Sequence, residues 1–222
     1  MASSSTPDTK ARAKVLLDRY GQTFAEEAGI KLADKPGPLY ELLVLSTLLS
    51  ARISAEIAVA AARELFAAGY RTPQAMRDAS WQDRVDALGR GHYRRYDERT
   101  STMLGRGAEL LIDRWAGDLR KLRSEAHGDV RRAGELLTEF PGIGPSGAGI
   151  YLREVQAVWP EVAPQLDGKV LDGARKVGLP ASAQELADLA GSGPDLARLA
   201  AALIRVSRGS RAAEEVVAAA AG

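Results

Sequence analysis

Apolar residues recur at intervals of three and four along most of the chain, which is the spacing expected of amphipathic helices. One stretch, Leu39–Arg52, is apolar on nearly every side, so we expect a central, buried helix there. Runs in which β-branched residues alternate with polar ones are absent, so the pattern predicts an all-α fold of about ten helices. The expected helical segments are 10–28, 39–52, 54–68, 73–79, 80–88, 101–115, 130–140, 145–158, 166–177, 183–190, 195–207 and 211–221.

Proline and glycine clusters divide the helical segments into two expected lobes. The segment 35–38 (KPGP) is the strongest such break, and we take it as the boundary at which a central lobe begins. We expect residues 38–155 to form this lobe, and residues 9–37 together with 156–222 to form a second lobe from both ends of the chain. A chain of 222 residues is long enough for two small domains. The serine-rich residues 1–8 are expected to be a disordered tail.

The composition excludes several classes of site. The chain has no cysteine, which rules out disulfides, thiolate nucleophiles, cysteine-based zinc sites and iron–sulfur clusters held by cysteine. Only His92 and His127 could supply imidazole, too few for a histidine-rich metal site. No apolar run reaches the roughly 20 residues that a membrane span needs, so we expect a cytoplasmic protein. Because the net charge is only +1, any basic surface must be local.

The most informative stretch is Leu136–Gly149, LLTEFPGIGPSGAG, where an amphipathic run is broken and a new helix begins. Pro145 suits the first turn of that new helix, since this position needs no N–H, so we expect a helix-hairpin-helix over about 130–155. Its glycines free backbone N–H groups and the second helix adds the positive end of its dipole, which predicts a cradle for a nucleic-acid phosphate. An ordinary pair of helices with a glycine-rich turn is the alternative. The break consists of Pro141, Gly142, Ile143 and Gly144.

Three further features carry candidate chemistry. Asp167 follows a proline-containing loop near the start of a predicted helix, where a carboxylate is either a simple N-terminal cap or a functional acid. Arg52 ends the buried helix and can project from it. The loop Gly89–Arg99 interleaves arginine with tyrosine, which suits phosphate contact and base stacking, although a solvated charged loop is the alternative. The side chains that we single out in this loop are Tyr93, Arg94, Arg95 and Arg99.

Together these segments resemble the helix-hairpin-helix (HhH-GPD) superfamily of DNA glycosylases, which includes endonuclease III. The motifs that carry the resemblance are LLSAR at 48–52, LLTEFPGIGPSGAG at 136–149 and QLDGKVLDGARKVGL at 165–179. The resemblance covers roughly residues 38–179 and implies a two-lobed helical fold that binds duplex DNA. The cysteines that hold an iron–sulfur cluster in many members are missing here. No cofactor is therefore expected, apart from a monovalent cation that hairpin carbonyls could hold in this family.

The resemblance also implies roles for individual residues. The family places its catalytic aspartate after the second hairpin helix, and Asp167 matches that position, with Asp172 as the alternative. Lyase-competent members carry a lysine where this chain has Ser146, which is similar to monofunctional members such as the adenine-mispair glycosylase. In the family a polar residue after LLSA enters the vacated base stack, and here it is Arg52. The segment before the aspartate is a few residues longer than usual, and Lys169, in place of a common histidine, is either a phosphate contact or a late-stage nucleophile.

The activity that this resemblance implies is that of a monofunctional repair glycosylase, which hydrolyses the N-glycosidic bond of a damaged or mispaired base flipped out of duplex DNA. A non-catalytic DNA-binding protein of the same fold is one alternative, and a bifunctional glycosylase/AP lyase that uses Lys169 is another. The expected partner is double-stranded DNA with a damaged base or an abasic site. We expect a monomer, associated with the nucleoid and not with a membrane.

Overall fold

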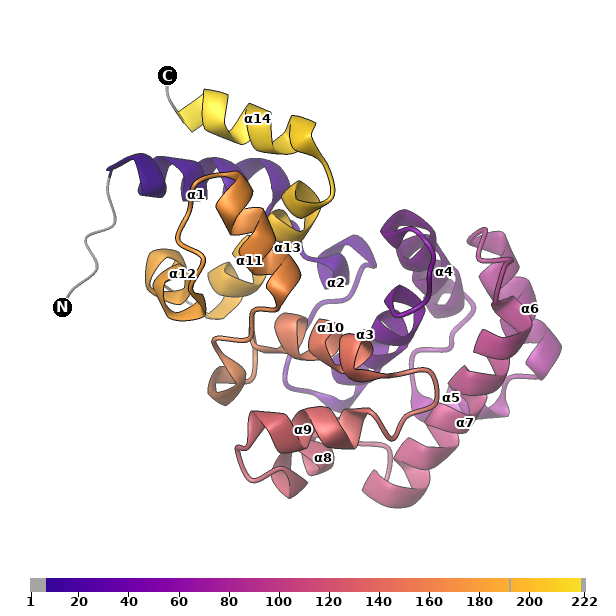
Figure 1. Ribbon diagram of the computed structural model, residues 1–222. Helices are drawn as coiled ribbons and strands as arrows, with labels where there is room; N and C mark the ends of the chain where they lie inside the picture. The colour runs from indigo at the N-terminus through magenta and orange to yellow at the C-terminus, as the bar shows by residue number, and fades with distance from the viewer. Residues whose placement is uncertain (1–6, 192, 221–222) are drawn as a thin grey trace. The chain divides into compact units, whose positions relative to one another are not determined.

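The computed structural model describes residues 7–191 and 193–220, and all regular elements within them are helical (Figure 1). The predicted all-α fold is therefore confirmed. No helix in these ranges is both long and apolar enough to cross a membrane. The helices are α1 (Pro7–Tyr20), α2 (Phe24–Glu27), α3 (Pro36–Leu49), α4 (Ala55–Ala67), α5 (Pro73–Asp78), α6 (Trp81–Arg90), α7 (Asp97–Trp115), α8 (Leu119–Glu125), α9 (Val130–Leu137), α10 (Pro145–Val155), α11 (Gly168–Lys176), α12 (Ala183–Ala190), α13 (Gly193–Ser207) and α14 (Ser210–Ala220), with a 3-10 helix η1 (Pro160–Val162) before α11.

The chain folds into two compact units, and their boundaries differ from those expected. The middle unit covers Ala25–Leu152, and the terminal unit combines residues up to Phe24 with those from Arg153 onward. The expected break at 35–38 is wrong, because these residues lead directly into α3 and Pro36 occupies its first turn, where a missing N–H is tolerated. Residues 1–6 of the expected tail lie outside the described residues, while Pro7 and Asp8 already belong to α1.

Helix α3 is the centre of the middle unit. Its residues from Leu39 to Leu48 are all buried, as the apolar pattern predicts, and α4, α7 and α8 pack against it. At the far end of α7, the ring of Trp115 stacks on Phe140, with the ring centroids 5.5 Å apart. Since Phe140 lies in the turn between α9 and α10, this contact fixes that turn to α7.

Helix α13 is the centre of the terminal unit, and α1, α11, α12 and α14 pack against it (Figure 1). Its approach to α11 is so close that a Cβ on Gly173 would overlap the carbonyl oxygen of Leu203. This glycine therefore lets α11 lie directly on the central helix of the unit. The position of α11 matters because Asp167 stands at its N-terminus.

The single helix expected over 10–28 is wrong, since α1 ends at Tyr20 and α2 is one short turn. Contacts from α13 account for the early end of α1. Arg205 donates a hydrogen bond of 3.0 Å to the carbonyl of Tyr20, and Arg198 donates one of 3.3 Å to the carbonyl of Gly21. These side chains satisfy the last carbonyls of α1, which a longer helix would have satisfied internally.

Candidate functional site

The glycine-rich turn, residues 138–144, joins α9 to α10 and depends on two glycines in different ways. Gly142 has a φ of +89°, and a Cβ added there would lie 2.9 Å from the sulfur of Met103 and 3.2 Å from Thr47. Gly142 thus permits both a left-handed backbone and close packing on α3 and α7. Gly144 has an ordinary φ, and a Cβ there would meet nothing within 4 Å.

The start of α10 presents backbone N–H groups to solvent. Gly144 accepts the hydrogen bond from the N–H of Ala148 at 2.9 Å and so begins the helical ladder. The N–H groups of Gly144 and Ser146 form no hydrogen bond with other described residues, and both residues are exposed. These groups and the positive end of the α10 dipole form the arrangement that binds anions at helix N-termini.

Ile143 was expected to take part in phosphate contact, but it is a core residue. Its side chain is only 3% exposed, and its N–H already donates a hydrogen bond of 3.0 Å to the carbonyl of Phe140. The isoleucine therefore anchors the turn in the core of the middle unit, while the neighbouring glycines remain on the surface.

A pocket of about 280 Å³ opens beside the turn and combines three of the segments identified in the sequence. The segment that follows α3 contributes Arg52, the start of α7 contributes Arg99, and the glycine-rich turn contributes Gly142. The expected helix over 39–52 ends at Leu49, so Arg52 lies beyond it. All of these residues belong to the middle unit. The complete lining consists of Thr47, Ser50, Ala51, Arg52, Tyr96, Arg99, Thr100, Met103 and Gly142.

The arginines of the pocket lining, and those of the loop that precedes α7, have no acidic partners among the described residues. Arg52, Arg94, Arg95 and Arg99 are exposed, and none of them forms an ion pair with a described residue. Arg95 makes a cation–π contact, in which its guanidinium lies over the ring of Tyr96 at 5.2 Å from the ring centroid. Exposed arginines without acidic partners are free to bind a ligand phosphate.

Several other arginines of the middle unit, such as Arg71, Arg77 and Arg114, do form ion pairs with acidic residues. Arg90 contacts Glu64 at 3.0 Å, and this arginine belongs to the end of α6, not to the loop in which it was expected. Two acidic residues of the same stretch, Asp97 and Glu98, form the first turn of α7. Their charge there complements the helix dipole.

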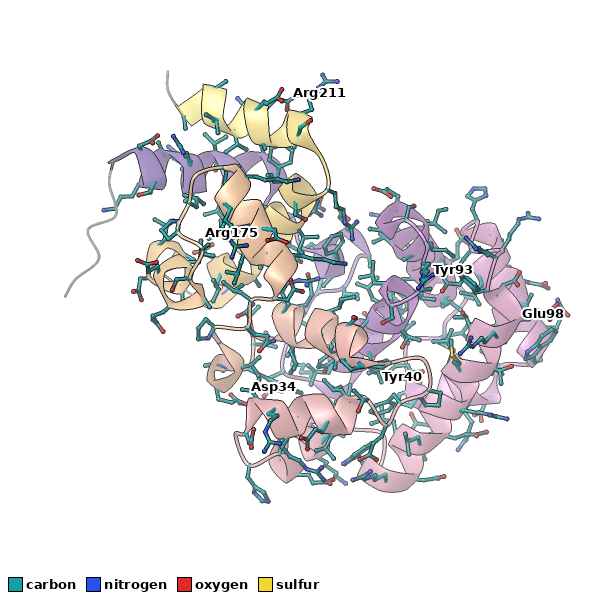
Figure 2. The ribbon with its side chains drawn as sticks, viewed as in Figure 1. Asp34, Tyr40, Tyr93, Glu98, Arg175 and Arg211 are labelled. Atoms are coloured by element: carbon teal, nitrogen blue, oxygen red, sulfur yellow. The ribbon has the colours of Figure 1, made fainter. Side chains whose placement is uncertain are left out.

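Tyr93, one of the expected contact residues, is a core residue (Figure 2). Its side chain is fully buried, with its hydroxyl 3.5 Å from that of Thr100. Burial raises the pKa of the Tyr93 hydroxyl, although the hydrogen bond with Thr100 opposes the shift. Base stacking by this ring is therefore ruled out in the folded unit, whereas Tyr96 of the same loop lines the pocket.

One further arginine belongs with the set around the pocket. Arg106 is exposed and forms no ion pair with a described residue. It follows Arg99 by seven residues and Met103 by three on α7, so all three lie on the same face of the helix. That helical spacing was the signal in the sequence that could have identified Arg106.

Asp167 occupies the N-cap position of α11 in the terminal unit. Its Oδ1 accepts a hydrogen bond of 3.1 Å from the N–H of Val170, and its Oδ2 contacts the Nη1 of Arg153 at 2.7 Å. The carboxylate nevertheless keeps 37% of its side-chain surface exposed, whereas the Arg153 side chain is 5% exposed. The predicted position at a helix start is confirmed, and the carboxylate is both held in place and open to solvent.

The other candidate residues on α11 are surface residues. Asp172 pairs with Arg175 at 2.5 Å on the same helix, and both side chains are about 60% exposed, at 63% and 59%. Lys169 is exposed in the first turn of α11. Neither residue contacts a buried group among those described, so Asp167 is the only one of the three that a buried side chain holds.

The long segment between the hairpin and Asp167 contains core residues of its own. Trp159 is fully buried and Val162, in η1, is 4% exposed. The additional length is thus packed into the terminal unit. Among the described residues, no group of three or more histidine, aspartate and glutamate side chains could hold a metal ion.

Comparison of the chain with models of known protein families, with curated proteins and with solved structures gives no match.

Proposed function

We propose that the protein is a DNA glycosylase, which hydrolyses the N-glycosidic bond of a damaged or mispaired base extruded from duplex DNA. The observation that carries the proposal is the pocket beside Gly142, where Arg52 and Arg99 lie next to the hairpin turn without acidic partners. Ser146 in place of a lysine supports a monofunctional, hydrolytic enzyme. A monomer in the nucleoid-containing cytoplasm fits this activity.

DNA binding is the first step of this function. Exposed N–H groups of Gly144 and Ser146 contact phosphate oxygens, and the arginines of α7 and the preceding loop extend the contact along the backbone. Extruding a nucleotide costs a few kcal/mol, which these contacts help to offset. Arg52 stands at the pocket and enters the space that the base leaves.

Asp167 supplies the chemical step. Cleavage of an N-glycosidic bond passes through a cation-like sugar, as in glycoside hydrolysis generally, and a nearby carboxylate stabilises that charge. The same group can orient or deprotonate the attacking water. The exposed part of the Asp167 side chain leaves room for this role, and the contacts to Val170 and Arg153 restrict its motion.

A non-catalytic DNA-binding protein is the second candidate, and one observation favours it. All the candidate DNA contacts belong to the middle unit, while both oxygens of Asp167 already have structural partners in the terminal unit. A protein that only binds DNA needs the first set and uses Asp167 as a helix cap.

A panel of duplexes, each with one damaged or mispaired base, tests the proposal. Single-turnover release of a base from at least one duplex, absent with the undamaged duplex, is the expected result. Tight binding without release from any member of the panel would favour the second candidate. Borohydride trapping on abasic DNA adds a separate reading, because a covalent adduct would indicate lyase chemistry at Lys169.

A further inference from the structure

Two long polar side chains that bind one segment, Arg153 and Gln156, are buried near the C-terminal end of α10, in the stretch LREVQ, where Glu154 is buried as well. The Arg153 side chain is 5% exposed and Gln156 is 1% exposed. Burying a guanidinium is costly unless it is paired and hydrogen-bonded. The contacts of these side chains explain why they are buried.

Both side chains bind the segment that leads into α11. The Nη1 of Arg153 donates to the Oδ2 of Asp167 at 2.7 Å, while its Nε is buried and has no partner among the described residues. The amide of Gln156 pairs with the backbone of Gln165, donating to its carbonyl at 3.2 Å and accepting from its N–H at 2.9 Å. Asp167 and Gln165 are thus held by the last turn of α10 and by the residue that directly follows this helix.

Capping alone does not explain this arrangement. The Oδ1 of Asp167 satisfies the N–H of Val170, which is all that an N-cap requires, and asparagine or serine would do the same. Arg153 acts on the second oxygen and so fixes the rotation of the carboxylate.

The neighbouring ion pair on α11 provides a contrast. Arg175 (labelled in Figure 2) and Asp172 are at a similar distance, 2.5 Å, but both side chains are exposed. Exposed pairs of this kind contribute little to stability or to geometry. Of the two aspartates, only Asp167 has a buried arginine that holds it.

We infer that Arg153, supported by Gln156, is a positioning residue that fixes the Asp167 carboxylate for base release. This inference rests on the function proposed above. It assigns to the α10 end of the chain a role in the rate of the chemical step, separate from the contacts between the hairpin and DNA. A carboxylate held in one orientation needs no rearrangement when positive charge develops on the sugar.

The test measures single-turnover base release by Arg153→Met, with Arg175→Met as the matched control from an exposed pair. We expect the rate constant of Arg153→Met to fall about 10- to 100-fold, as for a misplaced catalytic group, with unchanged affinity for the lesion duplex. The control should keep the parental rate constant. If Arg153 had only a structural role, the amplitude of base release would fall, because the amplitude is proportional to the amount of folded enzyme. The rate constant of the active fraction would then be unchanged.

A second variant and a double-mutant cycle keep the result clear. Arg153→Gln retains a polar donor in the buried site and should slow base release by a similar factor. This variant tests the inference if Arg153→Met folds poorly. If Arg153 acts through Asp167, Arg153→Met should slow an Asp167→Asn protein by less than about twofold.

The outcomes separate the two hypotheses. A parental rate constant in both Arg153 variants, with a slow Asp167→Asn protein, would overturn the positioning role and leave the glycosylase proposal standing. Additive effects in the cycle would overturn it as well. A parent without base release on any duplex, or an Asp167→Asn protein at full rate, would overturn the proposed function and the positioning role together.

Discussion

Gly142 packs so closely against Met103 that a Cβ on the glycine would lie 2.9 Å from the methionine sulfur. The hairpin turn is therefore seated on the face of α7 that also carries Arg99. The turn and the arginines are parts of one rigid surface within the middle unit. A change at Gly142 should consequently disturb the fold and the candidate DNA contacts at once, whereas a change at Gly144 should disturb only the contacts.

Gly142→Ala should lower the free energy of unfolding by about 1–2 kcal/mol, the cost of a left-handed backbone for a residue with a Cβ. The displacement of Met103 adds to this destabilisation. Thermal and urea unfolding measure the effect, and Gly144→Ala is the control, because a Cβ there meets nothing within 4 Å. Equal stability of the two variants would contradict the packing described for the turn.

Gly144→Val should weaken binding to every duplex by a similar factor while the protein stays folded. The branched side chain covers the exposed N–H groups at the start of α10, and contacts to the DNA backbone carry no base information. Fluorescence anisotropy with damaged and undamaged duplexes measures both dissociation constants. Parental affinity for undamaged DNA at moderate salt would remove the turn from the DNA-binding surface.

Features with local causes were predictable from the sequence. Ser54, Thr72 and Ser80 stand at or just before the starts of predicted helical segments, and each accepts a hydrogen bond from an N–H three residues ahead. Asp167 at a helix start follows the same rule. Such caps depend on a few neighbouring residues, so short sequence patterns are enough to identify them.

Features with tertiary causes were not predictable in the same way. The end of α1 depends on Arg205, far along the chain, and the burial of Tyr93 depends on its packing beside α7. Arg153 was overlooked because a charged residue in an apolar helix has no visible partner until the loop to Asp167 folds back. The arginine and the glutamine in LREVQ are the sequence signal that could have indicated this role for Arg153.

Replacing Arg94, Arg95 and Arg99 with alanine should lower the salt dependence of DNA binding. Removing one arginine–phosphate interaction reduces the slope of log K against log salt concentration by about 0.9 on duplex DNA. The control replaces Arg77, Arg90 and Arg131, which form exposed ion pairs with acidic residues of the same unit. The same slope in both triple variants would mean that the unpaired arginines are ordinary solvated residues.

Tyr93→Phe should leave DNA binding unchanged, because the ring is buried and its hydroxyl makes only a long contact with Thr100. Its free energy of unfolding should change by less than about 1 kcal/mol, the range for one weak hydrogen bond. Tyr96→Ala is the comparison, since Tyr96 lines the pocket and supports Arg95, and it should weaken binding. A larger decrease in affinity from Tyr93→Phe would restore Tyr93 as a contact residue.

Asp167→Asn is the variant that separates an enzyme from a binding protein. Base release should fall by at least about 10²-fold, because the amide can neither stabilise the developing cation by charge nor accept a proton from water. Affinity for the lesion duplex should be kept or increased, since a negative charge is removed. Asp172→Asn is the matched control on the same helix, and its exposed pair with Arg175 makes an unchanged rate the expected result.

The stability of Asp167→Asn provides the second reading of this experiment. Asparagine can still cap α11 through its oxygen, but it removes the charge that faces the buried Arg153. We expect a decrease of about 1–3 kcal/mol in the free energy of unfolding, the range for a hydrogen bond to a charged group, and a melting temperature lower by about 2–4 °C for each kcal/mol. Full activity in a folded Asp167→Asn protein would exclude Asp167 as the catalytic carboxylate, and a slow Asp172→Asn protein would then identify its replacement.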